Sequence, residues 1–178
     1  MINKKQNNSA YIDGANLHKG MLNLGWDLDY KRFRILLKEK YNVEEAFIFI
    51  GLIPKYKELY SYLQECGYIL IFKEVVYDFD GKAKGNCDAD LVLKMVSDFY
   101  NNKFEKSVIV TSDGDYASLV KMLFEKEKLR IILSPAKEKR CSILLKRIGA
   151  PITYINDLRG RVEYDYKKEK APDRDGTL

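Results

Sequence analysis

The feature that most constrains the fold is an alternation of short apolar runs with amphipathic segments along most of the chain. Apolar side chains between the runs recur at helical spacing, as Leu91, Val92, Met95 and Phe99 do. The runs themselves are typical of buried strands and cover residues 9–12, 46–51, 68–72, 108–111, 130–134 and 152–155. A strand followed by a helix, repeated in this way, predicts a parallel sheet covered by helices.

The repeated unit predicts an α/β fold, a three-layer α/β/α Rossmann-like domain with right-handed crossovers. We expect a mainly parallel sheet of five to six strands, in the order 3-2-1-4-5 when the strands are numbered along the chain. This order makes a topological switch point between the strands at 9–12 and 108–111. Ligands of open parallel sheets bind at such a point, beyond the carboxyl ends of the strands.

The chain has 178 residues, which is the size of one domain with a sizeable core. We expect a disordered lead over 1–8, the folded domain over 9–158 and a polar C-terminal tail over 159–178. No apolar run approaches the length of a membrane span and no signal-peptide core is present, so no membrane partner is expected. The three cysteines are odd in number and widely spaced, which indicates reduced thiols in a cytoplasmic protein.

Positive charge is concentrated in one segment of the chain. Residues 120–147 hold nine lysines and arginines and three glutamates, a net charge of +6, while the whole chain carries +5. A basic surface attracts polyanions, although a solvated helix face often has the same composition. His18 is the only histidine, so a zinc site built on several histidines is excluded.

Acidic residues stand where strands end and where a helix begins. Asp113 and Asp115 flank Gly114 directly after the strand at 108–111, and Asp13 follows the strand at 9–12. Two acids crowded at one sheet edge repel each other unless a cation or a shared proton relieves them. An ordinary helix N-cap is the alternative, but a cap needs only one acid. Asp88 opens a helix and reaches the same edge only if the preceding loop wraps over the top of the sheet.

Three segments of the chain resemble, in order, the signatures of the NYN domain, the LabA-like branch of the PIN-like nucleases. They are Asp13-Gly14-Ala15-Asn16-Leu17, Lys84-Gly85-Asn86-Cys87-Asp88 and Ser112-Asp113-Gly114-Asp115-Tyr116. The resemblance extends from about Tyr11 to about Arg159, and it departs from the family at Cys87, where an apolar residue such as Val is common. It implies a PIN/NYN fold.

The resemblance also implies a metal-dependent endoribonuclease whose catalytic and metal-binding residues are Asp13, Asp88, Asp113 and Asp115, with Asn16 as a polar helper. Mg²⁺ or Mn²⁺ would be the cofactor, since both prefer carboxylate oxygens and water. Such ions activate a water and stabilise phosphate oxygens during in-line displacement. Asp90 is a further acid at the same helix start, where a favourable charge on the helix terminus is the better interpretation.

We expect RNA to be the partner, bound by basic residues around the acids. The expected nucleic-acid-binding residues are Lys84, Lys137, Lys139, Arg140 and Ser112. Two alternatives stay open: a nucleic-acid-binding regulatory protein without useful turnover, and a metal-dependent phosphoesterase for small molecules. The intact set of four acids favours the enzyme, and the basic segment favours a polymeric anion. A homo-oligomer is compatible with each of these interpretations.

Overall fold

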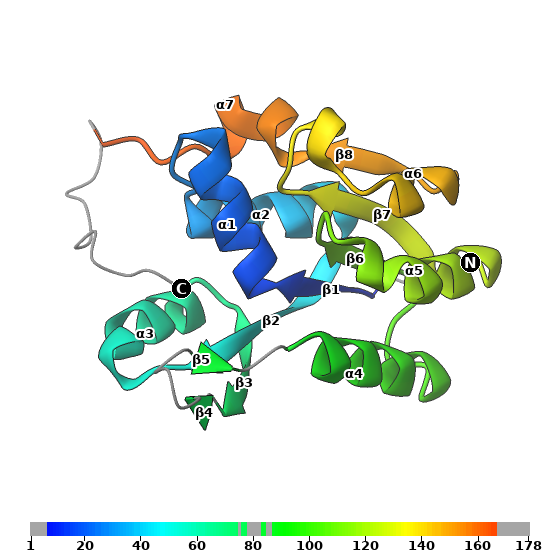
Figure 1. Ribbon diagram of the computed structural model, residues 1–178, viewed down its shortest axis with the longest axis horizontal. Coiled ribbons are helices and arrows are strands. Elements are labelled where there is room, and N and C mark those ends of the chain that lie inside the picture. The colour runs from blue at the N-terminus through cyan, green and yellow to red at the C-terminus, as the bar shows by residue number, and fades with distance from the viewer. Residues whose placement is uncertain (1–6, 75, 78–82, 85–86, 167–178) are drawn as a thin grey trace, which may run out of the picture.

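A computed structural model describes residues 7–74, 76–77, 83–84 and 87–166. Its centre is a six-stranded sheet in the order β3-β2-β1-β6-β7-β8, with every neighbouring pair parallel (Figure 1). The strands are β1 (Asn8–Asp13), β2 (Val43–Leu52), β3 (Ile69–Glu74), β6 (Ser107–Val110), β7 (Leu129–Ser134) and β8 (Ile152–Tyr154). The predicted α/β class and strand order are confirmed, because the six strands follow one another in the expected 3-2-1-4-5 sequence with one more strand beside the fifth.

Helices connect these strands and complete the layers. The α-helices are α1 (Gly14–Leu24), α2 (Tyr30–Tyr41), α3 (Lys57–Glu65), α4 (Asp88–Tyr100), α5 (Ala117–Glu125), α6 (Ile143–Arg147) and α7 (Arg159–Val162). Within the described residues, four short 3-10 helices accompany them, η1 (Pro54–Tyr56), η2 (Gly114–Tyr116), η3 (Glu138–Arg140) and η4 (Ile155–Leu158). A separate two-stranded ribbon pairs β4 (Val76–Tyr77) with β5 (Ala83–Lys84). None of the described helices has the length and apolar character needed to cross a membrane.

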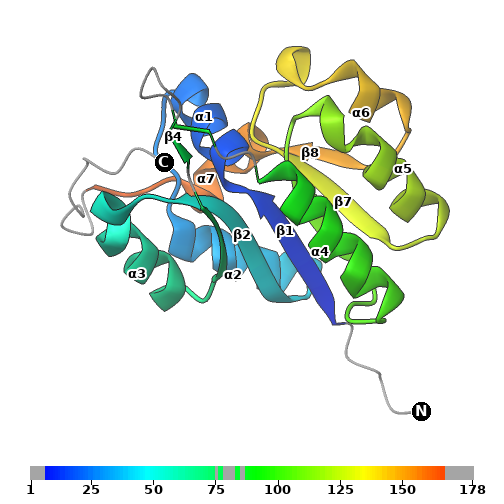
Figure 2. The ribbon, with the colours of Figure 1, turned by 60° about the horizontal axis from the view of Figure 1, so that its bottom comes forward.

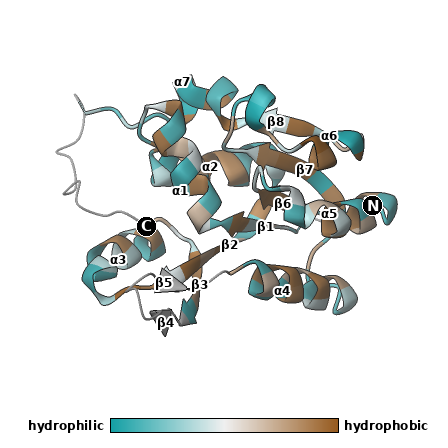
Figure 3. Ribbon diagram, in the orientation of Figure 1, coloured by the Kyte–Doolittle hydropathy of each residue, from teal (hydrophilic) through white to brown (hydrophobic). Residues whose placement is uncertain are grey.

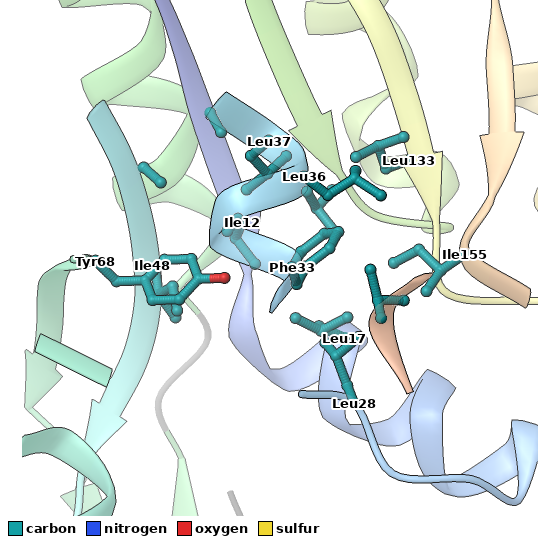
Figure 4. Packing of buried hydrophobic residues seen from close by; sticks show 14 of the residues in the cluster. Ile12, Leu17, Leu28, Phe33, Leu36, Leu37, Ile48, Tyr68, Leu133 and Ile155 are labelled. Carbon is teal, nitrogen blue, oxygen red and sulfur yellow. The ribbon is translucent and has the colours of Figure 1, made fainter. Parts of the chain in front are cut away.

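The core has two halves because side chains of a strand alternate between the faces of the sheet. Ala10 and Ile12 of β1 belong to the cluster that α1, α2, α3 and α7 cover, whereas Tyr11 belongs to the cluster under α4, α5 and α6. Figure 4 shows Phe33, Leu36 and Leu37 of α2 packed toward the first half of the core. In Figure 2, α4 lies in front of the sheet and α2 behind it, and Figure 3 shows the buried strands as strongly apolar.

A buried polar network holds α4 against the sheet. The hydroxyl of Tyr11 in β1 donates a hydrogen bond of 2.7 Å to Oδ2 of Asp98, and the ammonium of Lys94 lies 2.6 Å from the same oxygen. Lys94 also lies over the ring of Phe47 in β2, 4.5 Å from its centroid. These contacts orient the whole helix, including its first residue, Asp88.

The described part of the chain continues past residue 158, where we expected the folded domain to end. Residues 159–162 form α7, whose Val162 is fully buried in the core cluster with Leu158. The N–H of Asp29 donates a hydrogen bond of 2.8 Å to the carbonyl of Val162, and the N–H of Tyr164 donates one of 2.8 Å to the backbone carbonyl of Asp27. Residues 159–166 therefore pack on the domain, and the rest of the expected tail, 167–178, lies outside the described residues, as do residues 1–6 of the expected lead.

Candidate active site

Asp13 ends β1 at the carboxyl edge of the sheet and begins the next helix. Its Oδ1 accepts a 3.0 Å hydrogen bond from the N–H of Asn16, so it is the N-cap of α1. The turn is tight because Gly14 lies against β2: a Cβ atom at this position would be 2.6 Å from the carbonyl oxygen of Phe49. A glycine after the acid is therefore required by packing, and only 6% of the Asp13 surface is exposed.

Tyr116 joins two of the predicted acids. Its hydroxyl lies 2.5 Å from Oδ1 of Asp88 and 3.3 Å from Oδ2 of Asp13. The tyrosine comes from η2, after β6, and its ring is buried in the core under α4 and α5. The N-terminus of α4 thus lies at the same sheet edge as Asp13. Sequence reasoning assigned no role to any tyrosine, and the available signal was the position of Tyr116 directly after the acidic turn.

Asp113 and Asp115 stand in the turn that follows β6. Asp113 caps η2, because its Oδ1 accepts a 3.0 Å hydrogen bond from the N–H of Asp115, and its own N–H donates 3.1 Å to Oγ1 of Thr111. Its charge contributes to the raised pKa of Asp13, so the two carboxylates lie within electrostatic reach. Asp115 is exposed, and it contacts Asp113 through its backbone N–H rather than through its carboxylate.

Asn16 links the turns that follow β1 and β6. Its Oδ1 accepts hydrogen bonds of 2.9 Å from both the N–H and the hydroxyl of Ser112. A backbone N–H only donates, so the amide oxygen must face Ser112 and the amide nitrogen is left as a donor. The predicted helper residue therefore fixes the geometry between Asp13 and Asp113 from the first turn of α1.

The electrostatics of the site centre on Asp13. The pKa of its carboxyl is raised to about 6, chiefly by burial and also by the charges of Asp88 and Asp113, while the hydrogen bonds from Asn16 and Tyr116 oppose the rise. Burial and the flanking carboxylates hold the pKa of the Tyr116 phenol well above its ordinary value, so it remains a neutral donor. Burial, with the charge of Asp13, also raises the pKa of Cys87 to about 11, so this thiol is no nucleophile at neutral pH.

One carboxylate oxygen in the site lacks a strong donor. A phenol has a single proton, and the shorter contact directs the proton of Tyr116 toward Asp88. Oδ2 of the buried Asp13 is left with a long, weak hydrogen bond while carrying negative charge. Such an oxygen fits a hard divalent cation, and Mg²⁺ commonly binds one or two carboxylates and keeps several waters. Within the described ranges, no three Asp, Glu, His or Cys side chains are grouped closely enough to hold a metal ion together.

The predicted basic residues divide into those beside a pocket and those outside it. Lys137 and Arg140 line a pocket together with Asn16 and Ser112, whereas Lys139 is exposed in η3 and is not among the lining residues. For Lys84 only the backbone is described, in β5 opposite Val76. The pocket also includes Lys19, which sequence reasoning missed although it follows Asn16 at helical spacing.

Asp90 does not join the acidic group. Its carboxylate forms an ion pair of 2.8 Å with Lys73 of β3, and both side chains are more than one third exposed. The pair favours the interpretation of Asp90 as a helix-start charge. It also supplies a natural comparison for Asp88, two residues earlier on the same helix.

Comparisons with known proteins agree with this architecture. The sequence model of the NYN domain family matches residues 9–147. A crystal structure of a protein of unknown function from Vibrio parahaemolyticus superposes with a TM-score of 0.75 at 18% identity, covering 92% of this chain and 99% of that one. At this identity the likeness shows the shared fold alone. Among curated proteins, none matches the chain.

Proposed function

The chain belongs to the NYN domain family, within the PIN-like nuclease superfamily, and from this membership we propose that it is a divalent-metal-dependent endoribonuclease. The observation that carries the proposal is the meeting of Asp13 and Asp88 at the hydroxyl of Tyr116. These acids come from the end of a strand and the start of a helix, and the charge of Asp113 reaches the same place. Crowded carboxylates at the carboxyl edge of a parallel sheet suit metal-assisted hydrolysis better than they suit stability.

Mg²⁺ or Mn²⁺ would be held by Asp13 and Asp88, with the charge of Asp113 nearby. When bound, such an ion supplies an activated water and neutralises developing charge on the phosphate oxygens. The chain's own residues prepare the site for it. Tyr116 orients the carboxylate of Asp88 through the 2.5 Å hydrogen bond, and Asn16 holds one oxygen of Asp13 through its N–H. We assign Asp115, exposed at the rim, to contacts with the bound ion's water or with the substrate.

The polyanionic substrate follows from charge beside the acids. Lys137 and Arg140 lie in the segment after β7, and that segment adjoins the acidic turn after β6 because β6 and β7 are neighbours. The N–H of Ser142 donates 3.1 Å to the carbonyl of Ser112, which joins the two segments directly. Contacts from these cations to phosphates would supply affinity with little dependence on base sequence.

A cleavage assay tests the proposal. Single-stranded and double-stranded RNA are incubated with the protein in Mg²⁺, in Mn²⁺ and in chelator, and products are resolved by length. We expect internal cleavage with either ion and none with chelator. Asp88→Asn should lower the rate by about two orders of magnitude or more, because the uncharged amide is a much poorer ligand for these ions.

Asp90→Asn is the matched control for this assay. It removes one acid from the same helix turn, but from the exposed pair with Lys73, so cleavage should be unchanged. Equal rates for the parent and Asp88→Asn would contradict a catalytic role for the acids. Parallel losses in both variants would point to an effect on α4 rather than on the chemistry.

One observation favours a second function, nucleic-acid binding without turnover. Among the described residues, no three Asp, Glu, His or Cys side chains lie close enough together to hold a metal ion. A protein of this kind would bind RNA equally with chelator and with Mn²⁺, and would leave it intact in both. The same assay, combined with a binding measurement, separates the two functions.

A further inference from the structure

A pocket of about 340 Å³ opens beside the acidic site, between α1 and the segment after β7. Figure 1 shows this segment, in yellow, next to α1. We call it the basic pocket and define it by Asn16, Lys19, Asn23, Ser112, Lys137 and Arg140. Small-molecule sites have volumes of about 300–1,000 Å³, so the basic pocket is at the low end of this range. A pocket of this size suits one nucleotide and is too small for an RNA duplex.

The charge of the basic pocket is unbalanced. Lys19, Lys137 and Arg140 bring three cations, and none of the described lining residues is acidic. None of the three forms an ion pair with any described residue. Lys121 of α5, by contrast, has Glu125 at 3.8 Å. Cations that come from two separate segments and line a pocket without an acidic lining residue attract an anion, and a phosphate can accept hydrogen bonds from all three.

Asn16 and Ser112 place this pocket directly beside the acids. Asn16 lines the pocket, while its N–H donates to Asp13 and its side-chain oxygen accepts from Ser112. Ser112 also lines the pocket and precedes Asp113 in the chain. Asn16 and Ser112 therefore line the basic pocket next to the acidic site, and the amide nitrogen of Asn16 is a hydrogen-bond donor there.

Close packing keeps the basic pocket formed. At Gly20 α1 approaches the start of the segment after β7 so closely that a Cβ atom would lie 2.6 Å from both Cβ and the carbonyl oxygen of the buried Pro135. The segment is also closed by a hydrogen bond of 2.8 Å from the N–H of Arg140 to the carbonyl of Lys137. A preformed site loses less conformational freedom on binding, which favours affinity.

We propose that the basic pocket binds the unpaired nucleotide next to the scissile bond, with its phosphate between Lys19, Lys137 and Arg140. This proposal rests on the proposed ribonuclease function and adds to it a substrate class, single-stranded RNA. An RNA strand whose phosphate binds in the basic pocket would place its neighbouring phosphodiester next to Asp13 and Asp88, since Asn16 and Ser112 adjoin both sites. A paired nucleotide brings the opposite strand with it, and a pocket of about 340 Å³ has no room for a second strand.

Mononucleotide binding in chelator tests the proposal without any cleavage. Calorimetry with UMP and AMP compares the parent with Lys19→Ala, the double variant Lys137→Ala/Arg140→Ala, and Lys139→Ala. We expect the first two variants to weaken affinity about tenfold each, the loss typical of one or more charge-assisted hydrogen bonds. Lys139→Ala removes one positive charge, as Lys19→Ala does, but Lys139 lies in η3 and does not line the pocket. The mononucleotide affinity of this variant should therefore match that of the parent.

Ligand controls identify what the pocket recognises. Uridine should bind far more weakly than UMP, and inorganic phosphate should also bind more weakly than UMP. The three arms together indicate a nucleotide site. Equal binding of inorganic phosphate and UMP would overturn the nucleotide assignment, and an unchanged affinity in Lys19→Ala would overturn the pocket itself.

The substrate preference gives a second, separate readout. With Mn²⁺ the parent should cleave single-stranded RNA in preference to duplex, and Lys19→Ala should raise KM more than it lowers kcat. Equal cleavage of the two forms would contradict the single-strand assignment. Absence of all cleavage, with UMP binding intact and sensitive to Lys19→Ala, would instead contradict the ribonuclease function and leave the pocket in place.

Discussion

The carboxylate of Asp13 is ionised at neutral pH at a cost to folding, because it is buried beside two other acids and its pKa is raised to about 6. Asp13→Asn should therefore increase the free energy of unfolding without metal by about 1–3 kcal/mol at pH 7.5. Asparagine still caps α1, so the hydrogen bond to Asn16 survives. Urea unfolding of both proteins measures the difference, and the same substitution should abolish RNA cleavage.

The pH dependence of this difference has a defined sign. The folded pKa is higher than the ordinary value of 3.8, so the folded state binds the proton more tightly than the unfolded chain does. The parent should lose stability relative to Asp13→Asn as the pH rises from about 4 to about 6, and the gap should stay constant above that window. A gap that does not change across the window would show that Asp13 is not strained by ionisation.

At the scale of elements, the position of α1 depends on its contact with the segment after β7. Gly20→Ala should destabilise the protein by about 1–3 kcal/mol, since the added methyl must displace Pro135 or the helix. It should also weaken UMP binding, because α1 forms one side of the basic pocket. Thermal unfolding and calorimetry measure the two effects.

Gly160→Ala in α7 is the matched control for this substitution. Apart from the backbone and chain neighbours of its own helix, no described residue has an atom within 4 Å of the Cβ position at Gly160, and Gly160 lies within α7. The substitution should be neutral or stabilise by up to about 1 kcal/mol through helix propensity. Equal losses from the two glycines would mean that the contact with Pro135 is unimportant.

At the scale of the whole molecule, the C-terminal segment completes the core. Val162 is buried with Ile155 and Leu158 on the face that α2 covers, and Arg32 of α2 donates 3.1 Å to the carbonyl of Glu163. A chain that ends at residue 158 should lose at least about 2 kcal/mol of stability, the contribution of one buried valine and its neighbouring contacts. A chain that ends at Tyr166 retains these contacts and should unfold like the parent in urea.

The sequence by itself determined the sheet and the ends of its strands. Short continuous apolar runs and apolar side chains with a period of 3.6 are local patterns, so β1, β6 and their acids Asp13 and Asp113 could be predicted from the sequence. The order of the strands followed from the doubly wound arrangement that alternating strands and helices adopt, with right-handed connections. The ends of the strands and the starts of the helices depend on residues that are neighbours in the chain, so local patterns predict them directly.

Only the tertiary structure decided how distant segments complete the site. Tyr116 meets Asp88 over 28 residues and Asp13 over 103, and no period in the sequence marks such a contact. The same holds for Lys19, which belongs to the basic pocket because α1 packs at Gly20 against Pro135. Close packing of elements selects these partners after the elements have formed, and the position of each depends on the shapes of all the others.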